Sequence, residues 1–169
     1  MKLSLFTTIT NPEQQGYAWK EALACYNDLA DEVIVIDGTK PETLWPEEFK
    51  WELIGQQFQR GYERATGDFV IHADIDFFFH EYDFKKIRDV LEEKRDLPAL
   101  SFWKYQFLLA DRYNLKSRLV IAVNKGKFGD RIKFNSGGDL CQPSLDGQYL
   151  SPDNVTEARI PFYNYDFSF

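Results

Sequence analysis

The chain has 169 residues, of which 44% are hydrophobic and 28% charged, with a formal net charge of -7 and a pI of about 4.9. This length and composition suit one globular domain and exclude a disordered chain. Because an acidic surface repels phosphate backbones, we expect no nucleic acid partner. No apolar run approaches the roughly 18 residues that cross a bilayer, so we expect no transmembrane segment.

Two features of the sequence indicate a reduced, cytoplasmic setting. Cys25 and Cys141 are far apart and form no CxxC pattern, which argues against a zinc site or a disulfide framework. The apolar start of the chain is soon interrupted by the polar residues Thr7 and Thr8, so it is more typical of a first buried strand than of a secretory signal.

The first half of the chain alternates strands with amphipathic helices. Strands are predicted at residues 2–9, 33–36 and 69–71, and helices at residues 13–30, 50–66 and 83–94. The continuous apolar run from Val33 to Ile36 is typical of a strand that is buried on both faces of a parallel sheet. This alternation predicts parallel strands joined by right-handed crossovers.

The second half of the chain is richer in strands. They are predicted at residues 99–109, 117–134 and 160–165, with Gly126 and Gly129 at turns and a loop over residues 135–152. We therefore expect an α/β fold in which a Rossmann-like, mostly parallel sheet flanked by helices is followed by a more β-rich half. The aromatic end of the sequence either packs into the sheet or leads into a longer natural chain.

Three carboxylates come directly after predicted strands, namely Asp37 after the second strand and Asp74 and Asp76 after the third. Ligands of parallel α/β sheets bind at this end of the strands. Alternation along an extended segment would place Asp74 and Asp76 on one side, where they would hold Mg²⁺ or Mn²⁺ and, through it, a diphosphate. The alternatives are that this pair only caps the next turn, and that Asp37 begins a plain Asp-Gly turn.

The order of these elements resembles the family 2 glycosyltransferases of GT-A fold. The resemblance is carried by the segments Thr7–Asn11, Glu32–Thr39 and Ala65–Asp76, and it covers about residues 1–95. Its most specific part is the A-x-G-D-hydrophobic run that leads into the D-x-D pair. It implies a metal-dependent transfer of sugar from a nucleoside-diphosphate sugar to a glycan or other hydroxyl acceptor. Residues 1–95 would form the nucleotide-binding half and residues 96–169 the acceptor-side half of a single domain, residues 1–169.

The resemblance also implies roles for individual residues. Asp37 would meet the base or ribose, Asp74 would lie beside the ribose or a metal-bound water, and Asp76 would bind the metal. Thr7 and Asn11 would border the nucleoside pocket.

Arg60 and Arg64 are four residues apart on a predicted helix and so share one face, from which one of them could reach the diphosphate. The alternative is a solvated helix face for at least one of them. For the base that deprotonates the acceptor, the best candidate is Asp139 in its glycine-bearing loop, with Asp111 and Asp146 weaker. The alternative for Asp139 is a surface loop without a role.

Related proteins often carry a histidine near the final strand, and here Asn164 takes that place. His72 is expected to be a hydrogen-bonded core residue, whereas His80 follows the D-x-D pair closely enough to approach a metal. Two other functions stay open, a domain that binds nucleotide or glycan without turnover and a metal-dependent nucleotidyltransferase. A phosphatase of the haloacid dehalogenase type fits poorly, because its D-x-D pair follows the first strand.

Overall fold

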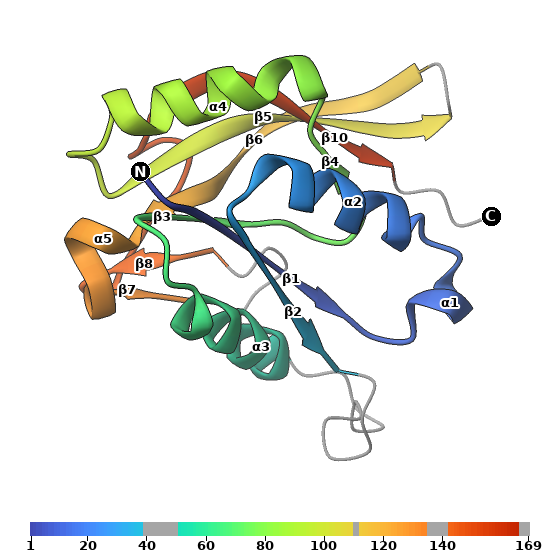
Figure 1. Ribbon diagram of the computed structural model, residues 1–169, viewed down its shortest axis with the longest axis horizontal. Coiled ribbons are helices and arrows are strands. Elements are labelled where there is room, and N and C mark those ends of the chain that lie inside the picture. Colours follow the sequence, from blue (N-terminus) through green and yellow to red (C-terminus); the bar gives the residue numbers. More distant parts are fainter. Residues whose placement is uncertain (39–50, 110–111, 135–141, 166–169) are drawn as a thin grey trace.

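The computed structural model describes residues 1–38, 51–109, 112–134 and 142–165 (Figure 1). Its main feature is a seven-stranded sheet with the strand order β2-β1-β3-β6-β5-β10-β4. The strands are β1 (Leu3–Ile9), β2 (Glu32–Asp37), β3 (Phe69–His72), β4 (Phe77–Phe78), β5 (Ala99–Leu109), β6 (Arg112–Asn124) and β10 (Thr156–Tyr165). Strands β2, β1 and β3 are mutually parallel and β5 is parallel to β10, whereas β6 runs antiparallel to both β3 and β5. The predicted α/β class with a mostly parallel sheet is therefore confirmed.

Helices cover both faces of this sheet. The helices are α1 (Pro12–Gln15), α2 (Trp19–Leu29), α3 (Trp51–Arg64), α4 (Glu81–Glu93), α5 (Lys125–Phe128) and the 3-10 helix η2 (Gly129–Arg131). The buried side chains of α2 and α4 share one apolar core with the sheet. Those of α3 share a second core, on the other face, with the small sheet of β7 (Ile132–Lys133), β8 (Ser144–Leu145) and β9 (Gln148–Tyr149). Of the helices within the described ranges, none combines the length and hydrophobicity needed to cross a membrane.

Four predicted elements differ from the structure, the first being the loop expected over residues 135–152, which contains the short strands β8 and β9. The helix expected over residues 13–30 is two helices, because Gly16 ends α1 with a φ of 71°. Strand β2 lies at the edge of the sheet, so Val33, Ile34 and Val35 are only partly buried and the prediction of burial on both faces was wrong. The strand expected to continue to residue 134 ends at Asn124, whose side-chain Oδ1 accepts a hydrogen bond from Lys127 N (3.0 Å) and so begins α5.

The A-x-G-D run that precedes β3 holds this strand against the start of β1. The side chain of Asp68 accepts a hydrogen bond from Lys2 N (2.7 Å), and Gly67 N donates one to Ser4 Oγ (2.8 Å). A Cβ at Gly67 would lie only 2.7 Å from Ser4 N and 2.9 Å from Lys2 O, so a larger residue would push the two segments apart. The run thus has a structural role of its own, at the end of the sheet opposite to the D-x-D pair.

Glu32, at the start of β2, joins the same three segments. Its carboxylate accepts hydrogen bonds from Thr66 N (2.8 Å), from Thr66 Oγ1 (2.9 Å) and from Ser4 Oγ. Burial raises the pKa of Glu32, but the hydrogen bonds from Ser4 and Thr66 outweigh it and bring the pKa down to about 2. The carboxylate therefore fixes the end of α3 against the first two strands only while it is ionised.

The C-terminal end of α3 has a cationic cap. Lys125 Nζ donates hydrogen bonds to the carbonyl oxygens of Tyr62 (2.7 Å), Glu63 (3.0 Å) and Ala65 (2.6 Å). The last carbonyls of a helix carry partial negative charge and are incompletely hydrogen-bonded, so a positive charge is favourable beside them. The cap fixes the position of α3, which carries the two arginines predicted to meet a diphosphate.

Candidate functional site

The D-x-D pair lies in a tight turn between β3 and β4. Phe77 N donates a hydrogen bond to Asp74 O (2.9 Å), which closes the turn over Asp74, Ile75 and Asp76. The prediction that an extended segment would alternate the two carboxylates was therefore wrong in its geometry, because the backbone turns immediately after Ala73. Both aspartates are partly exposed, whereas Ile75 between them is 8% exposed and anchors the turn in the core.

Strand β10 lies against this turn and contacts Asp76 twice. Asn164 Nδ2 donates a hydrogen bond to Asp76 Oδ2 (2.6 Å), and Tyr165 N donates one to Asp76 O (3.1 Å). Asn164 is 4% exposed, so its amide orients the carboxylate from within the protein. The sequence identified Asn164 only as a substitution for a histidine, and the structure places it in direct contact with the predicted metal ligand.

A buried tyrosine supports the turn from the other side, which sequence reasoning did not foresee. The Tyr26 hydroxyl lies 2.6 Å from Asp74 O and 2.8 Å from Phe77 O, as a donor to these carbonyls at both ends of the turn. Burial raises the pKa of Tyr26 well above its usual value, and the negative charges of Asp76 and Asp74 raise it further. Tyr26 thus stays a neutral donor. Its place on the apolar face of a helix gave no signal beyond core packing.

The carboxyl ends of β1 and β2 bring together the residues predicted to border the nucleoside. Asp37, the last residue of β2, is exposed, and the next residue, Gly38, donates its backbone N–H to Ile9 O at the end of β1 (2.7 Å). Thr7 is buried, and its Oγ1 has no hydrogen-bond partner in the structure. Asn11 precedes α1 in the left-handed conformation, with a φ of 45°. Asp37, Thr7 and Asn11 therefore lie at one edge of the sheet.

A pocket of about 330 Å³ opens between β2 and α3 and unites three of the predicted residues, Asp37, Arg60 and Arg64. Both arginines are exposed on the same helix face, as their spacing predicted. The Oε1 atom of Gln57 is buried without a hydrogen-bond partner beside them, and sequence reasoning missed this residue. The lining residues are Val35, Ile36, Asp37, Gln57, Arg60, Glu63 and Arg64. Two guanidinium groups beside a carboxylate suit a ligand with both an anionic and a hydrogen-donating part.

Of the remaining predicted residues, those within the described ranges belong to neither the D-x-D turn nor the pocket beside Asp37. Asp139 and Asp111 lie outside the described residues. Asp146 forms an ion pair with Arg131 (2.5 Å) in the turn between β8 and β9, and the hydrogen bond from this guanidinium lowers the pKa of Asp146, which is unfavourable for a base. His80 begins α4, where its Nδ1 accepts a hydrogen bond from Tyr82 N (3.3 Å).

His72 is a core residue, as predicted, but its Nδ1 atom has no hydrogen-bond partner. Its ring lies among three phenylalanines, with centroid distances of 6.1 Å to Phe6, 5.5 Å to Phe58 and 5.1 Å to Phe134. Burial lowers the pKa of His72 to about 3, so the ring stays neutral at physiological pH. It belongs to the core rather than to a metal site.

The donor chemistry of the turn fits Mg²⁺ or Mn²⁺. Asp74 and Asp76 offer oxygen atoms, which these ions prefer. Within the described ranges no group of three or more histidine, cysteine or carboxylate side chains is placed to form a metal cage. With only two carboxylates as ligands, such an ion would complete its coordination with water and substrate phosphates.

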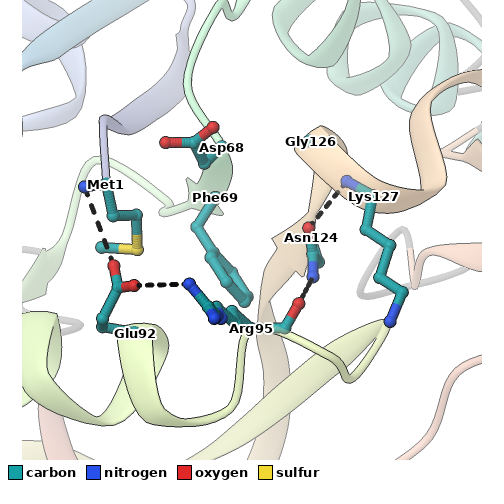
Figure 2. Close-up of a pocket in the computed structure, with 8 residues that line it drawn as sticks. All are labelled: Met1, Asp68, Phe69, Glu92, Arg95, Asn124, Gly126 and Lys127. Atoms are coloured by element: carbon teal, nitrogen blue, oxygen red, sulfur yellow. Dashed lines mark hydrogen bonds and ion pairs between the residues drawn. The ribbon is translucent and has the colours of Figure 1, made fainter.

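A second pocket, of about 370 Å³, lies at the opposite end of the sheet, beside the starts of β1 and β3 (Figure 2). Its charged groups already have partners within the protein. Glu92 lies 3.7 Å from the amino group of Met1 and 3.5 Å from Arg95, and Asn124 Nδ2 donates to Arg95 O (2.6 Å). Because ligands of parallel sheets bind at the carboxyl ends of the strands, we assign this pocket no part in the site.

Comparison with known proteins finds solved structures of low similarity to this chain. The chain matches no protein-family model and no curated protein. S. aureus TarS 1-349 in complex with UDP-GlcNAc is 19% identical over 66% of this chain and 36% of that chain, with a TM-score of 0.45. The complex of the same protein with UDP is 19% identical over 66% of this chain and 37% of that chain, with a TM-score of 0.45. The bifunctional IspDF from Campylobacter jejuni is 10% identical over 76% of this chain and 42% of that chain, with a TM-score of 0.46.

The chain therefore spans less than half the length of each of these proteins. At such low identities and TM-scores the likeness carries no argument about chemistry.

Proposed function

We propose that the chain is a glycosyltransferase of GT-A type, which moves a sugar from a nucleoside-diphosphate sugar to an acceptor hydroxyl. The observation that carries this proposal is the pocket that joins Asp37 to Arg60 and Arg64 at the carboxyl end of β2. The D-x-D turn follows β3, which runs parallel to β1 and β2, so both features belong to the same edge of the sheet. A nucleoside diphosphate would use both features at once.

In this proposal the pocket holds the nucleoside and part of the diphosphate. Asp37 accepts hydrogen bonds from the base or ribose, while Thr7 in β1 and Asn11 just before α1 border the same ligand. One or both of Arg60 and Arg64 bind diphosphate oxygens, because a guanidinium pairs with phosphate through two parallel hydrogen bonds.

The D-x-D turn would act on the leaving group. Asp74 and Asp76 would hold Mn²⁺ or Mg²⁺ together with diphosphate oxygens. When bound, such an ion neutralises the negative charge that develops on the departing diphosphate. Asn164 and Tyr26 keep the turn in place through the contacts described above. Asp139 remains our candidate for the base that takes the proton of the acceptor hydroxyl.

Calorimetric titration of UDP, GDP and their sugars, with and without Mn²⁺, tests the donor site. We expect binding that Mn²⁺ strengthens and that Arg64→Ala weakens by about tenfold or more, since a hydrogen bond to a charged group contributes about 1.5–3 kcal/mol. Arg95→Ala, at the opposite end of the sheet, is the matched control and should bind as the parent does. Absence of nucleotide binding, or unchanged binding in Asp76→Ala, would contradict the proposal.

The metal site has a separate test at Asn164. Asn164→Asp places a second carboxylate beside Asp76 and should lower stability without metal by about 1–2 kcal/mol, because like charges repel at this distance. Millimolar Mn²⁺ should then raise the melting temperature of this variant far more than that of Asn164→Ala, which loses the hydrogen bond but gains no charge. If Mn²⁺ leaves the melting temperature of Asn164→Asp unchanged, no cation binds beside Asp76.

The contact of Asn164 with Asp76 favours a second candidate, a domain that binds a nucleotide or glycan without turnover. In the glycosyltransferases that the sequence resembles, a histidine often takes this place, whereas a neutral amide that donates to the carboxylate offers the site only a weak metal ligand. A metal-dependent nucleotidyltransferase remains the third possibility. The released product separates them. Transfer releases nucleoside diphosphate from the donor, and nucleotidyl transfer releases pyrophosphate from a nucleoside triphosphate. Binding alone releases neither.

A further inference from the structure

One face of the outer strands β5, β6 and β10 is covered by aromatic side chains that neither the core nor the donor site uses. Residues paired across neighbouring strands share a face, and so do alternate residues along one strand. Three such rows follow from the register of these strands, with Trp103, Tyr105 and Phe107 in the middle strand. The members that we call the aromatic face are Trp103, Tyr105, Phe107, Tyr113, Tyr163 and Tyr165.

The rings of the aromatic face contact one another in a continuous series. The centroids of Tyr105 and Tyr113 lie 5.0 Å apart, those of Phe107 and Tyr165 lie 5.1 Å apart, and those of Tyr105 and Tyr163 lie 6.1 Å apart. Unlike Phe102 on the opposite face of β5, which is fully buried, these rings stay partly exposed, and Tyr113 is 53% exposed. Soluble proteins expose such contiguous rings mainly where something binds.

Polar and charged groups alternate with the rings. Lys116 Nζ lies 4.5 Å from the centroid of Trp103 and 5.1 Å from that of Tyr105, and Arg118 lies 5.7 Å from Trp103. Glu157 accepts a hydrogen bond from Trp103 Nε1 (2.5 Å). Arg118 also lies 4.0 Å from Glu157 and 4.0 Å from Asp153, so the rings are framed by paired polar groups and the face is not purely apolar. A pyranose chain suits both kinds of group, because its C–H faces lie on aromatic rings while its hydroxyls bond to polar side chains.

The aromatic face continues directly to the D-x-D turn. Tyr165 N donates to Asp76 O (3.1 Å), and the ring of Tyr165 lies 5.5 Å from that of Phe78, two residues after Asp76. Strands β5 and β10 are parallel to each other, and β5 and β3 each run antiparallel to β6, so their carboxyl ends lie at the same edge as the turn (Figure 1). A chain lying on the face would therefore end beside the proposed metal site.

We infer that the aromatic face is a carbohydrate-binding site, which holds a chain of pyranose residues with one end directed at the D-x-D turn. That this site holds the acceptor of the transfer rests on the proposed function. That it binds carbohydrate follows from the contacting rings and their polar neighbours alone. Lys116 and Arg118 accommodate either a neutral chain, through its hydroxyls, or a carboxylated one, through charge pairing.

Saturation-transfer NMR and calorimetry test the site with cellohexaose and chitohexaose as neutral probes and hexagalacturonate as the carboxylated one. We expect at least one probe to bind at millimolar concentration, with the strongest saturation on its ring C–H protons. Replacing both rings, in Tyr105→Ala/Tyr163→Ala, should weaken binding by about tenfold or more, as loss of a stacking ring does elsewhere. The variant Tyr105→Phe/Tyr163→Phe keeps the rings and should retain binding.

Tyr82→Ala removes a tyrosine of α4 that is 85% exposed and lies outside the aromatic face, so it should bind as the parent does. Melting curves show whether each variant is folded, and the NMR result on the unaltered protein needs no variant. If none of the three probes binds, or if the double alanine variant is folded and binds equally well, the assignment is overturned.

The same titrations separate this site from the donor site. Oligosaccharide binding without nucleotide should persist in Arg64→Ala, whereas UDP binding should persist in Tyr105→Ala/Tyr163→Ala. Carbohydrate binding in a chain that binds no nucleotide would uphold the aromatic face and refute the glycosyltransferase. Nucleotide binding without any carbohydrate binding would do the reverse.

Discussion

Tyr26→Phe tests whether the D-x-D turn depends on a buried hydroxyl. The substitution removes one oxygen atom and leaves the ring, which is fully buried between α2 and the turn, without a large cavity. The hydroxyl has one proton to donate, although two carbonyl oxygens, of Asp74 and Phe77, lie within 2.8 Å of it. The loss is therefore that of one buried hydrogen bond plus incomplete solvation of the carbonyls, about 1–2 kcal/mol.

For a domain of this size such a loss lowers the melting temperature by about 3–6 °C. Differential scanning calorimetry measures this change, and the same protein is then titrated with UDP and Mn²⁺. Because the turn would hold the ion, we expect weaker Mn²⁺-dependent binding in Tyr26→Phe even at temperatures where the variant is fully folded. Tyr82→Phe, at an exposed tyrosine, should change neither quantity. If Tyr26→Phe melts with the parent and binds the nucleotide equally well, the hydroxyl does not organise the turn.

Three further substitutions test the supports around the site. Glu32 has its pKa lowered to about 2, so its contribution is present above pH 4.5 and is lost as the pH falls towards 2. In Glu32→Gln the free energy of unfolding should fall by about 1–2 kcal/mol less than in the parent between pH 4.5 and 2. This difference is smaller than the whole pKa change implies, because the Glu32 side chain is 25% exposed. His72→Phe should stabilise the fold by about 1 kcal/mol, since it removes an unpaired polar atom from an aromatic core. It should also reduce the loss of stability as the pH falls from 6.5 towards 3, where only the unfolded chain protonates the histidine. Lys125→Met should cost about 1–2 kcal/mol in urea unfolding through the lost cap of α3, and more than Lys127→Met, whose ion pair with Asp96 is exposed. A parent-like acid limb for Glu32→Gln, a less stable His72→Phe, or a Lys125→Met that unfolds with the parent would contradict these assignments.

The sequence was sufficient for the elements whose pattern is local. The apolar run at residues 69–71 predicted β3 correctly, and the amphipathic pattern of residues 50–66 predicted α3. The position of a strand within its sheet does not depend on local sequence alone. The apolar run from Val33 to Ile36 is typical of a central strand, yet β2 is an edge strand of the described sheet. A strand is central only if other segments of the chain pair with both of its sides, and its own sequence does not report this.

The candidate site shows the same division. The four-residue spacing of Arg60 and Arg64 was enough to place both on one face of α3. The turn between Asp74 and Asp76 depends on a backbone hydrogen bond and on the side chains of Tyr26 and Asn164, which are far away in sequence. The residue pattern around the D-x-D motif does not reveal such long-range contacts. An extended segment was therefore expected, and this expectation was wrong.

The most specific part of the sequence resemblance is also the part with the least chemistry. Gly67 and Asp68 fix the start of β3 through backbone contacts with Ser4 and Lys2, at the opposite end of the sheet from the turn. Any protein that needs this strand arrangement would keep such a run, with or without an active site. Whether this chain transfers sugar therefore depends on what surrounds Asp76, whose carboxylate accepts a hydrogen bond from the Asn164 amide. A substitution at Asn164 consequently says more about function than any substitution in the A-x-G-D run.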